Sequence, residues 1–272
     1  MKPFFSIIIP TLNEERYLPK ILRSLSNQTD KSFEVIIVDA HSEDKTKEVA
    51  LQFSNKFIFN FFEVDKRNVS FQRNFGVSKS EGDYLIFLDA DAGISLSFIK
   101  GIKKIITHKK GLVFIPHIIP DEKNQFDIKL VFNVVNFLID ASQYVGKPLS
   151  SGGSMIFEKN FFLRIGGFDE SLPYAEDHNL VQKAYKWGVR ANFLPQIKVK
   201  FSLRRLKREG RLKLLYKYLL STAYVLVKGD IKKKIYNYEM GGQFYANKNK
   251  EALFKDYITQ VNNYFKGIFK ED

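Results

Sequence analysis

Acidic side chains at the ends of apolar runs are the residues of this chain whose types and spacing could do chemistry. Asp39 ends one run of β-branched and aromatic residues, and Asp89-Ala-Asp91 follows another. Such runs, bounded by turn signals, predict buried strands of a parallel sheet. Ligands of open α/β sheets bind beyond the carboxyl ends of the strands, where these acids would lie. Carboxylates at that edge could hold a cation, a ribose or a reacting hydroxyl group.

The pair Asp89 and Asp91 offers the most specific chemistry. Two acids separated by one residue bring two carboxylates to one edge of a cleft. Mg²⁺ is typically held by one or two carboxylates together with substrate phosphates. The alternative is that both acids only cap the turn before a helix at Ser95, since short motifs often match by chance.

The other acids also allow two interpretations. Asp39 could accept a hydrogen bond from a nucleobase N–H, or it could face the N-terminus of the next helix, where Ser42 can cap as well. Glu176 and Asp177 follow a Gly-Gly turn and open an amphipathic stretch. Acids are common at a helix start because the macrodipole favours them. A carboxylate there could equally take a proton from a reacting hydroxyl.

The order of the segments predicts the fold class. Strand-like and helix-like segments alternate through the first half, which predicts an α/β fold with a mostly parallel sheet between two helical layers, of Rossmann-like three-layer type. The second half is less regular. Expected strands are 4–10, 33–38, 57–64, 84–88, 112–116, 152–157 and 191–201, and expected helices are 14–26 with Asn13 as N-cap, 42–53, 69–78, 95–108, 126–144, 177–187 and 211–228.

Composition narrows the class of protein. A chain of 272 residues is long enough for one large α/β domain with an appendage. It has no cysteine, which excludes a disulfide framework and thiolate metal sites. The apolar run near the N-terminus is too short for a signal peptide, and no stretch approaches the ~20 apolar residues of a membrane-spanning helix. We therefore expect a cytoplasmic protein.

The net charge of +13 is unevenly distributed. Residues 198–234 contain 13 Lys and Arg against two acids. Within them, 204–234 has a basic stripe and a wide apolar face, which is typical of a helix lying on an anionic membrane surface. The alternative is a helix packed on the rest of the protein with a solvated lysine edge. Peripheral attachment to the inner face of the membrane is thus one expectation.

Six segments together resemble, in order, the signature of family 2 glycosyltransferases with the GT-A fold. The resemblance covers about residues 4–190, and the full set is specific although each piece is weak. It implies a hexosyl-type transferase that uses a nucleotide sugar linked to UDP, GDP or dTDP, with no nucleic acid partner. Only the basic amphipathic segment over 204–234 suggests a lipid-linked or cell-surface glycan as the acceptor. The segments are Ser6–Glu15, Ile37–Asp44, Gln72–Gly76, Gly82–Asp91, Gly166–Glu170 and Ala175–Asp177.

The resemblance also implies roles for individual residues. It places Asp91, with Asp89, at a divalent cation, Mg²⁺ or Mn²⁺, and makes Asp177 the catalytic base beside Glu176. Direct displacement at the sugar would invert the anomeric centre. The implied nucleotide-sugar contacts are Pro10, Thr11, Asn13, Glu15, Asp39, Arg73, Asn74, Asp89, Gly153, Arg204 and Arg205.

The implied domains are a GT-A catalytic domain over 1–202 and a basic, amphipathic helical region over 203–272. The nucleotide-sugar half of the catalytic domain would span about 1–92 and the acceptor half about 93–202. Three departures from the family pattern stand out. The second-strand motif reads Asp-Ala-His-Ser, Asn179 replaces a common acid, and the Gln-x-x-Arg-Trp motif of processive synthases is absent. The last departure favours transfer of one sugar over polymerisation.

Rival classes fit less well. A haloacid-dehalogenase-type phosphatase needs Asp-x-Asp on its first strand, whereas here the motif follows the fourth. A sugar nucleotidyltransferase needs a Gly-rich basic loop near the N-terminus, and Walker A and G-x-G-x-x-G patterns are missing. The remaining alternative is a polyanion- or lipid-binding protein on a degenerate transferase scaffold. It predicts salt-sensitive binding without metal-dependent affinity for nucleotide sugars.

Overall fold

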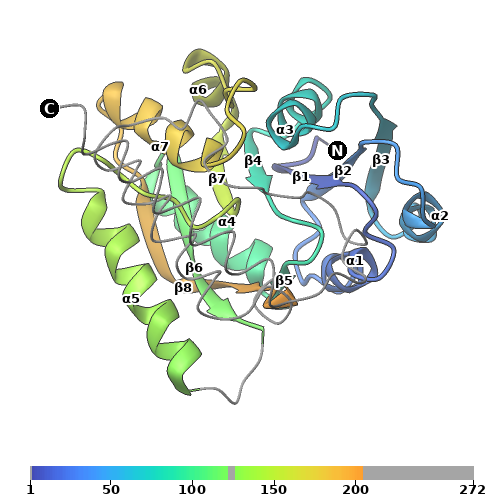
Figure 1. Cartoon of the computed structure of the whole chain (residues 1–272), viewed down its shortest axis with the longest axis horizontal. Coiled ribbons are helices and arrows are strands. Elements are labelled where there is room, and N and C mark those ends of the chain that lie inside the picture. Colours follow the sequence, from blue (N-terminus) through green and yellow to red (C-terminus); the bar gives the residue numbers. More distant parts are fainter. Residues whose placement is uncertain (1, 122–125, 205–272) are drawn as a thin grey trace, which may run out of the picture.

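The computed structural model describes residues 2–121 and 126–204 of the chain (Figure 1). Its first half contributes four strands of one sheet, all parallel to their neighbours in that half. Their hydrophobic residues are almost entirely buried except on the outer strand, β3, as expected for parallel strands covered on both faces. The strands are β1 (Phe5–Thr11), β2 (Phe33–Asp39), β3 (Ile58–Glu63) and β4 (Tyr84–Phe87).

The second half extends the same sheet with mixed directions. The eight strands stand in the order β3-β2-β1-β4-β7-β6-β8-β5. Strand β7 (Met155–Glu158) runs antiparallel to β4 and to β6 (Val113–Pro120). Strand β8 (Asn192–Phe201) is parallel to β6, and the two-residue β5 (Gly93–Ile94) is antiparallel to β8. The sheet is therefore mixed, with its continuous parallel part in the N-terminal half.

Helices cover both faces of the sheet, and this confirms the three-layer α/β prediction (Figure 1). Alternate residues of β1 and β2 point into two separate cores. One core lies under α1 (Leu18–Ser26), α2 (Thr46–Leu51) and α4 (Phe98–Lys109). The other lies under α3 (Val69–Ser78), α5 (Phe126–Ser142), α6 (Lys159–Arg164) and α7 (Glu176–Lys186).

The carboxyl ends of β1 and β2 lie side by side. Thr11 pairs in register with Asp39, the last residue of β2. The side-chain amide of Gln72, on α3, donates to the carbonyl oxygens of Thr11 and Val38 at 2.9 and 2.8 Å. The Asp-x-Asp segment leaves β4, the other neighbour of β1, at the same end. The strands thus bring Asp39, Asp89 and Asp91 to one edge of the sheet.

One predicted helix start is wrong. Asn13 does not cap a helix, because α1 begins five residues later at Leu18 and Asn13 has a left-handed backbone with φ +54°. The side chain of Asn13 instead accepts a hydrogen bond from the Glu43 N–H at 2.7 Å, and its N–H donates to the Ser42 hydroxyl. These contacts hold the segment after β1 as a loop over the start of the second βα connection.

The expected helix over 211–228 and the rest of the basic region lie outside the described residues. The division at residue 202 and the two halves of the catalytic domain stay predictions. Among the residues that the structure describes, none of the helices has both the length and the hydropathy needed to cross a bilayer.

Candidate active site

A buried arginine joins two acidic motifs that lie far apart in the sequence. Arg73, on α3, is 2% exposed. Its Nη2 donates to Asp89 Oδ1 at 2.9 Å and its Nη1 donates to Glu176 Oε1 at 2.7 Å. The ring of Phe168 lies 5.2 Å from the guanidinium carbon. The Asp-x-Asp segment and the Glu-Asp segment are therefore parts of one site.

Burial and charge act against each other at this arginine. Burial alone lowers the pKa of Arg73, but the carboxylates of Asp89, Glu176 and Asp177 outweigh it, so the net shift is upward and the group stays charged. Burial also raises the pKa of Glu176, with a further upward contribution from Asp177, while Arg73 opposes both. One guanidinium thus holds together a cluster that carries more negative than positive charge.

A glycine allows the close approach at the centre of this cluster. Gly153, in the loop before β7, has φ +96°. A Cβ atom at this position would lie 2.6 Å from Arg73 Nη2 and 3.1 Å from both carboxylate oxygens of Asp89. The preceding Gly152 donates its N–H to Asp177 Oδ2 at 3.0 Å. This loop therefore brings Asp177 to the same site.

A second arginine holds the other acid of the Asp-x-Asp pair. Arg204 follows β8, and its Nε lies 2.8 Å from Asp91 Oδ2. Its two terminal nitrogens donate to the two carboxylate oxygens of Glu14 at 2.7 and 2.8 Å. The guanidinium carbon lies 4.6 Å from the ring centre of Tyr17. Burial raises the pKa of Glu14, Arg204 opposes this shift, and the nearby charges of Asp91 and Asp89 add to it.

The residues around Asp39, which sequence analysis assigned to the nucleotide, form a compact hydrogen-bonded group. Asp39 is buried, and its Oδ1 accepts from the hydroxyls of Thr11 at 2.7 Å and Ser42 at 2.6 Å. Its Oδ2 accepts from the Ser42 N–H at 2.7 Å. Asn13 contacts the same serine. This geometry serves both interpretations of Asp39, because it orders the loop before α2 and leaves the carboxylate at the sheet edge.

Two other predicted residues make contacts that hold loops. Asn74 donates to the Phe168 carbonyl and to Glu170 Oε1, and it accepts from the Phe168 N–H. Asn74 therefore fixes the turn that follows Gly166 and Gly167.

Glu15, another predicted nucleotide contact, accepts from the Lys45 N–H at 3.1 Å. For Asn74 and Glu15, as for Pro10 at the end of β1, contact with a nucleotide stays a prediction; Arg205 lies outside the described residues.

The oxygen ligands around Asp91 suit a hard divalent cation. Glu14, Asp89 and Asp91 are close enough for the two aspartates to raise the pKa of Glu14. Such hard cations take carboxylate oxygens and complete their coordination with phosphate and water oxygens. No group of three or more His, Cys, Asp or Glu in the described part of the chain is arranged as a metal site, so water or phosphate oxygens would supply the remaining ligands of a cation here. The site fits a cation that is shared with a phosphate-bearing ligand.

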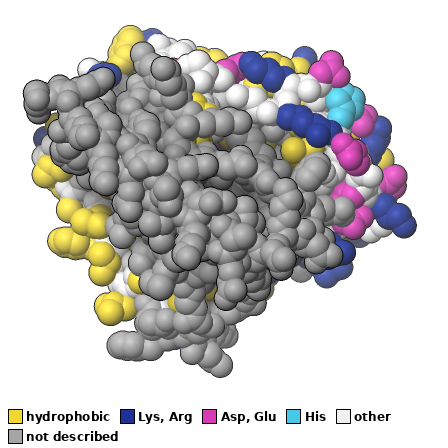
Figure 2. All heavy atoms as spheres, in the orientation of Figure 1, with side chains coloured by type: hydrophobic (Ala, Val, Ile, Leu, Met, Phe, Trp, Pro, Cys, Tyr) yellow, Lys and Arg dark blue, Asp and Glu magenta, His cyan; other side chains and the backbone are white. Residues whose placement is uncertain are grey.

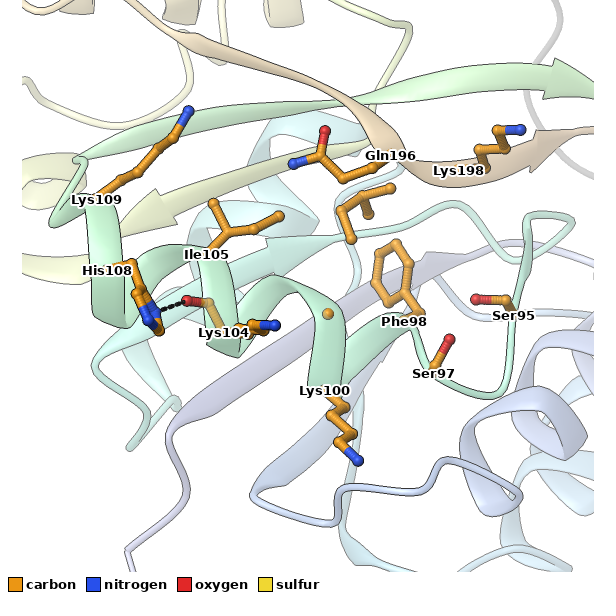
Figure 3. Close-up of a pocket in the computed structure, with 12 residues that line it drawn as sticks. Ser95, Ser97, Phe98, Lys100, Lys104, Ile105, His108, Lys109, Gln196 and Lys198 are labelled. Carbon is orange, nitrogen blue, oxygen red and sulfur yellow. Dashed lines mark hydrogen bonds between the residues drawn. The ribbon is translucent and has the colours of Figure 1, made fainter.

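A hollow of about 680 Å³ lies away from these residues, between α4 and β8. Its lining includes Phe98, Ile105 and Ile197 with several lysines, and none of the predicted site residues. Figure 3 shows Lys100 and Lys109 pointing in different directions, so their ammonium groups do not converge on one point. The carboxylate cluster identifies the active site better than this hollow does.

Sequence reasoning missed Glu14 and Tyr17. The signal for Glu14 was present: the Pro-Thr-x-Asn-Glu spacing places its glutamate directly after Asn13, at position 14 and not at Glu15. Glu14 was overlooked because a helix was expected to begin there, and an acid in the first turn of a helix needs no partner. Nothing local marks Tyr17, whose contact with Arg204 spans most of the described chain.

Comparisons with known proteins agree with this geometry. A family model described as glycosyl transferase family 2 matches residues 6–166. An uncharacterised glycosyltransferase of Haemophilus influenzae is 28% identical over 186 residues, covering 65% of this chain and 60% of that protein. The poly(ribitol-phosphate) beta-N-acetylglucosaminyltransferase TarS of Staphylococcus aureus is 27% identical over 228 residues, covering 81% of this chain and 37% of that protein. The chain thus spans less than two thirds of these relatives.

Solved structures show the same fold. S. aureus TarS 1–349 in complex with UDP-GlcNAc superposes with a TM-score of 0.61 at 22% identity, covering 75% of this chain and 59% of that one. Mannosyltransferase PcManGT of Pyrobaculum calidifontis, in complex with GDP-Man and Mn²⁺, gives 0.64 at 16% identity, covering 96% and 69%. These likenesses confirm the predicted GT-A fold.

The contact at Gly153 gives a testable prediction. Gly153→Ala should disturb the Arg73–Asp89 pair as well as strain the backbone. Gly166→Ala is the matched control, because Gly166 also has a left-handed backbone, with φ +80°, but a Cβ there would meet nothing within 4 Å. The control should cost about 1–2 kcal/mol of unfolding free energy, and Gly153→Ala clearly more in urea melts. Equal losses would show that Arg73 moves aside freely.

Proposed function

The chain belongs to glycosyl transferase family 2, and from this premise we propose that it transfers one sugar from a nucleoside-diphosphate sugar to a hydroxyl acceptor, with inversion at the anomeric carbon. The observation that carries the proposal is the pairing of Arg73 with both Asp89 and Glu176. It joins a strand-end Asp-x-Asp segment, suited to a donor phosphate site, to an acid pair suited to an acceptor.

The donor lies, in this proposal, along the carboxyl edge of β1, β2 and β4. Thr11, Asn13 and Asp39 surround the nucleoside, and Asp89 contacts the ribose or the donor sugar. Arg204 contacts the diphosphate through the side of its guanidinium that faces Asp91, since its two terminal nitrogens hold Glu14. TarS in complex with UDP-GlcNAc and PcManGT in complex with GDP-Man support a nucleotide sugar as donor and leave the nucleobase open.

The cation belongs with the donor diphosphate at Asp91 and Asp89. Mg²⁺ or Mn²⁺ there would act as a Lewis acid on the phosphate oxygens of the leaving group. The chain's own part is to fix the carboxylates: Arg73 holds Asp89, and Arg204 lies against Asp91. PcManGT, whose structure contains Mn²⁺ with GDP-Man, supports a divalent cation in a protein of this fold.

Asp177 is the proposed general base. Its Oδ2 accepts the Gly152 N–H, which fixes the carboxylate, so its Oδ1 is the oxygen proposed to take the proton of the acceptor hydroxyl. The acceptor oxygen then bonds to the anomeric carbon while the bond to the diphosphate oxygen breaks, and the diphosphate leaves with that electron pair. Glu176 is held by Arg73 and acts as a positioning residue.

Peripheral attachment to an anionic membrane is the second part of the proposal, and α5 supports it. Its outward face carries large hydrophobic side chains, including Phe137 at 69% and Val134 at 50% exposure. Figure 2 shows hydrophobic side chains along the left edge of the view, where Figure 1 places α5. Exposed Tyr144 lies next to Arg190 at the end of this face, and an aromatic residue beside a cation is typical of a membrane interface.

A charge argument favours lipid over a second copy as the cover for this face. Exposed Lys129, Lys147 and Arg190 lie on or near it, together with the exposed acid Asp140. The chain also carries a net charge of +13, so two copies brought face to face would repel. An anionic lipid surface complements both the apolar face and the basic residues. A lipid-linked acceptor would then be presented on the side of the chain that touches the membrane.

The donor class is tested by thermal denaturation of the full chain with UDP-, GDP- and dTDP-sugars, with and without Mn²⁺. One donor should raise the melting temperature, and only when Mn²⁺ is present, because binding to the native state stabilises it by mass action. Stabilisation by anionic polymers at low salt, with none from any nucleotide sugar, would instead favour the binding protein on a degenerate scaffold.

The general base is tested by Asp177→Asn. Transfer should fall by about 10²–10⁴-fold in kcat, because the amide cannot accept the proton, while the KM for the donor changes little. Asp83→Asn is the control, since Asp83 is 53% exposed before β4 and pairs only with Lys2 in the described chain. The assignment is wrong if the two variants retain the same activity, or if Asp177→Asn acts mainly on the donor KM.

Membrane attachment is tested by flotation of the full chain with anionic liposomes at low salt. The double variant Val134→Ser with Phe137→Ser should float less than the wild type, because it removes apolar area from the face of α5. Leu51→Ser, at a similarly exposed position on α2, is the control. If the double variant floats as well as the control, α5 does not contact lipid; if it only changes from dimer to monomer in solution, the face joins two copies.

A further inference from the structure

Arg204 occupies the position at Asp91 where a cation is proposed to bind. Its Nε lies 2.8 Å from Asp91 Oδ2, and both side chains are about 15% exposed. A metal ion and a guanidinium both need this carboxylate, and two positive charges at one oxygen repel each other strongly in a partly buried site. The contact seen here and a metal contact to the same oxygen therefore exclude one another.

Glu14 and Tyr17 hold the guanidinium of Arg204 by contacts that do not involve Asp91. Glu14 holds it by two hydrogen bonds of 2.7 and 2.8 Å, in the bidentate geometry that arginine and carboxylate prefer. Tyr17 packs against it at 4.6 Å. Both contacts use parts of Arg204 other than its Nε. Loss of the Asp91 contact therefore leaves Arg204 anchored beside the site.

We propose that Glu14 and Tyr17 are positioning residues for Arg204, and that Arg204 keeps Asp91 paired until a cation and a diphosphate replace it. This inference rests on the proposed function, because it presupposes a cation at Asp91. Without ligand, the guanidinium neutralises a carboxylate that would otherwise repel Asp89 and Glu14. With ligand, the same group is already beside the phosphate oxygens and needs only to turn.

The test uses a pair of substitutions that leaves the net charge unchanged. Glu14→Gln with Arg204→Gln removes both charges of the Glu14–Arg204 pair, so only Asp91 loses its partner and the long-range field is nearly conserved. Binding of Mn²⁺ alone, followed by the electron paramagnetic resonance signal of the free ion, should become tighter by on the order of tenfold, the effect of removing one competing positive charge from Asp91. Binding of UDP or GDP should weaken by a similar factor.

The double variant is expected to bind Mn²⁺ more tightly and UDP or GDP more weakly. Loss of a purely structural contact would instead weaken the binding of both ligands. Arg16→Gln is the matched control, an exposed arginine in the same segment, and should leave Mn²⁺ binding unchanged. Tyr17→Leu introduces no buried charge, so it remains informative if the double variant fails to fold. It should tighten Mn²⁺ binding by a smaller factor, because Arg204 is held less firmly at Asp91.

Two failures are distinguishable. If the wild type binds UDP or GDP with Mn²⁺ but neither the double variant nor Tyr17→Leu binds Mn²⁺ more tightly, Arg204 does not compete with the cation and only this inference is overturned. An equal gain in Mn²⁺ affinity in Arg16→Gln also overturns the inference, because the gain would then come from removing any nearby positive charge. If the wild type binds Mn²⁺ neither alone nor with any nucleotide, the proposed cation site fails and the inference with it.

Discussion

The burial of the Arg73 guanidinium among carboxylates is the constraint on which the site depends. Removing an ion from water costs several kcal/mol, and only well-placed opposite charges offset that cost. Asp89 and Glu176 supply them from segments far apart in the sequence. The fold must therefore bring the end of β4 and the start of α7 to α3. Gly153 has no side chain because a Cβ atom would occupy the space where these charges meet.

The N-terminal strands and the acids that follow them were predictable from the sequence, because their composition marks them. Buried parallel strands are nearly continuous apolar runs, so β1, β2 and β4 and the acids after them could be located without a structure. Their pairing in one sheet then follows from the βα alternation. The mixed second half was less predictable. Its strands pair out of chain order, and a two-residue strand such as β5 has no pattern of its own.

The parts of the site that escaped prediction depend on contacts between distant residues. The loop from Asn13 to Tyr17 looks like a helix start by composition. However, Asn13 donates to the Ser42 hydroxyl and accepts from the Glu43 N–H, and these hydrogen bonds hold the segment as a loop. Only then can Glu14 turn inward and meet Arg204, 190 positions away. No local propensity encodes such a pair. Here tertiary contacts override the helix propensity of the acids, and they do so at the proposed donor site.

Arg73 and Arg204 hold the two acids of the Asp-x-Asp pair in different ways. Arg73 is almost fully buried and bridges Asp89 and Glu176, whose charges offset the cost of burying the guanidinium. Arg204 is more exposed and keeps Glu14 if it releases Asp91. Asp91 is therefore the acid that we propose exchanges its arginine for a cation. In the proposed function, a cation that arrives with the donor would meet one carboxylate held by a buried arginine and one that changes partner, which suits the binding and release of a diphosphate in every turnover.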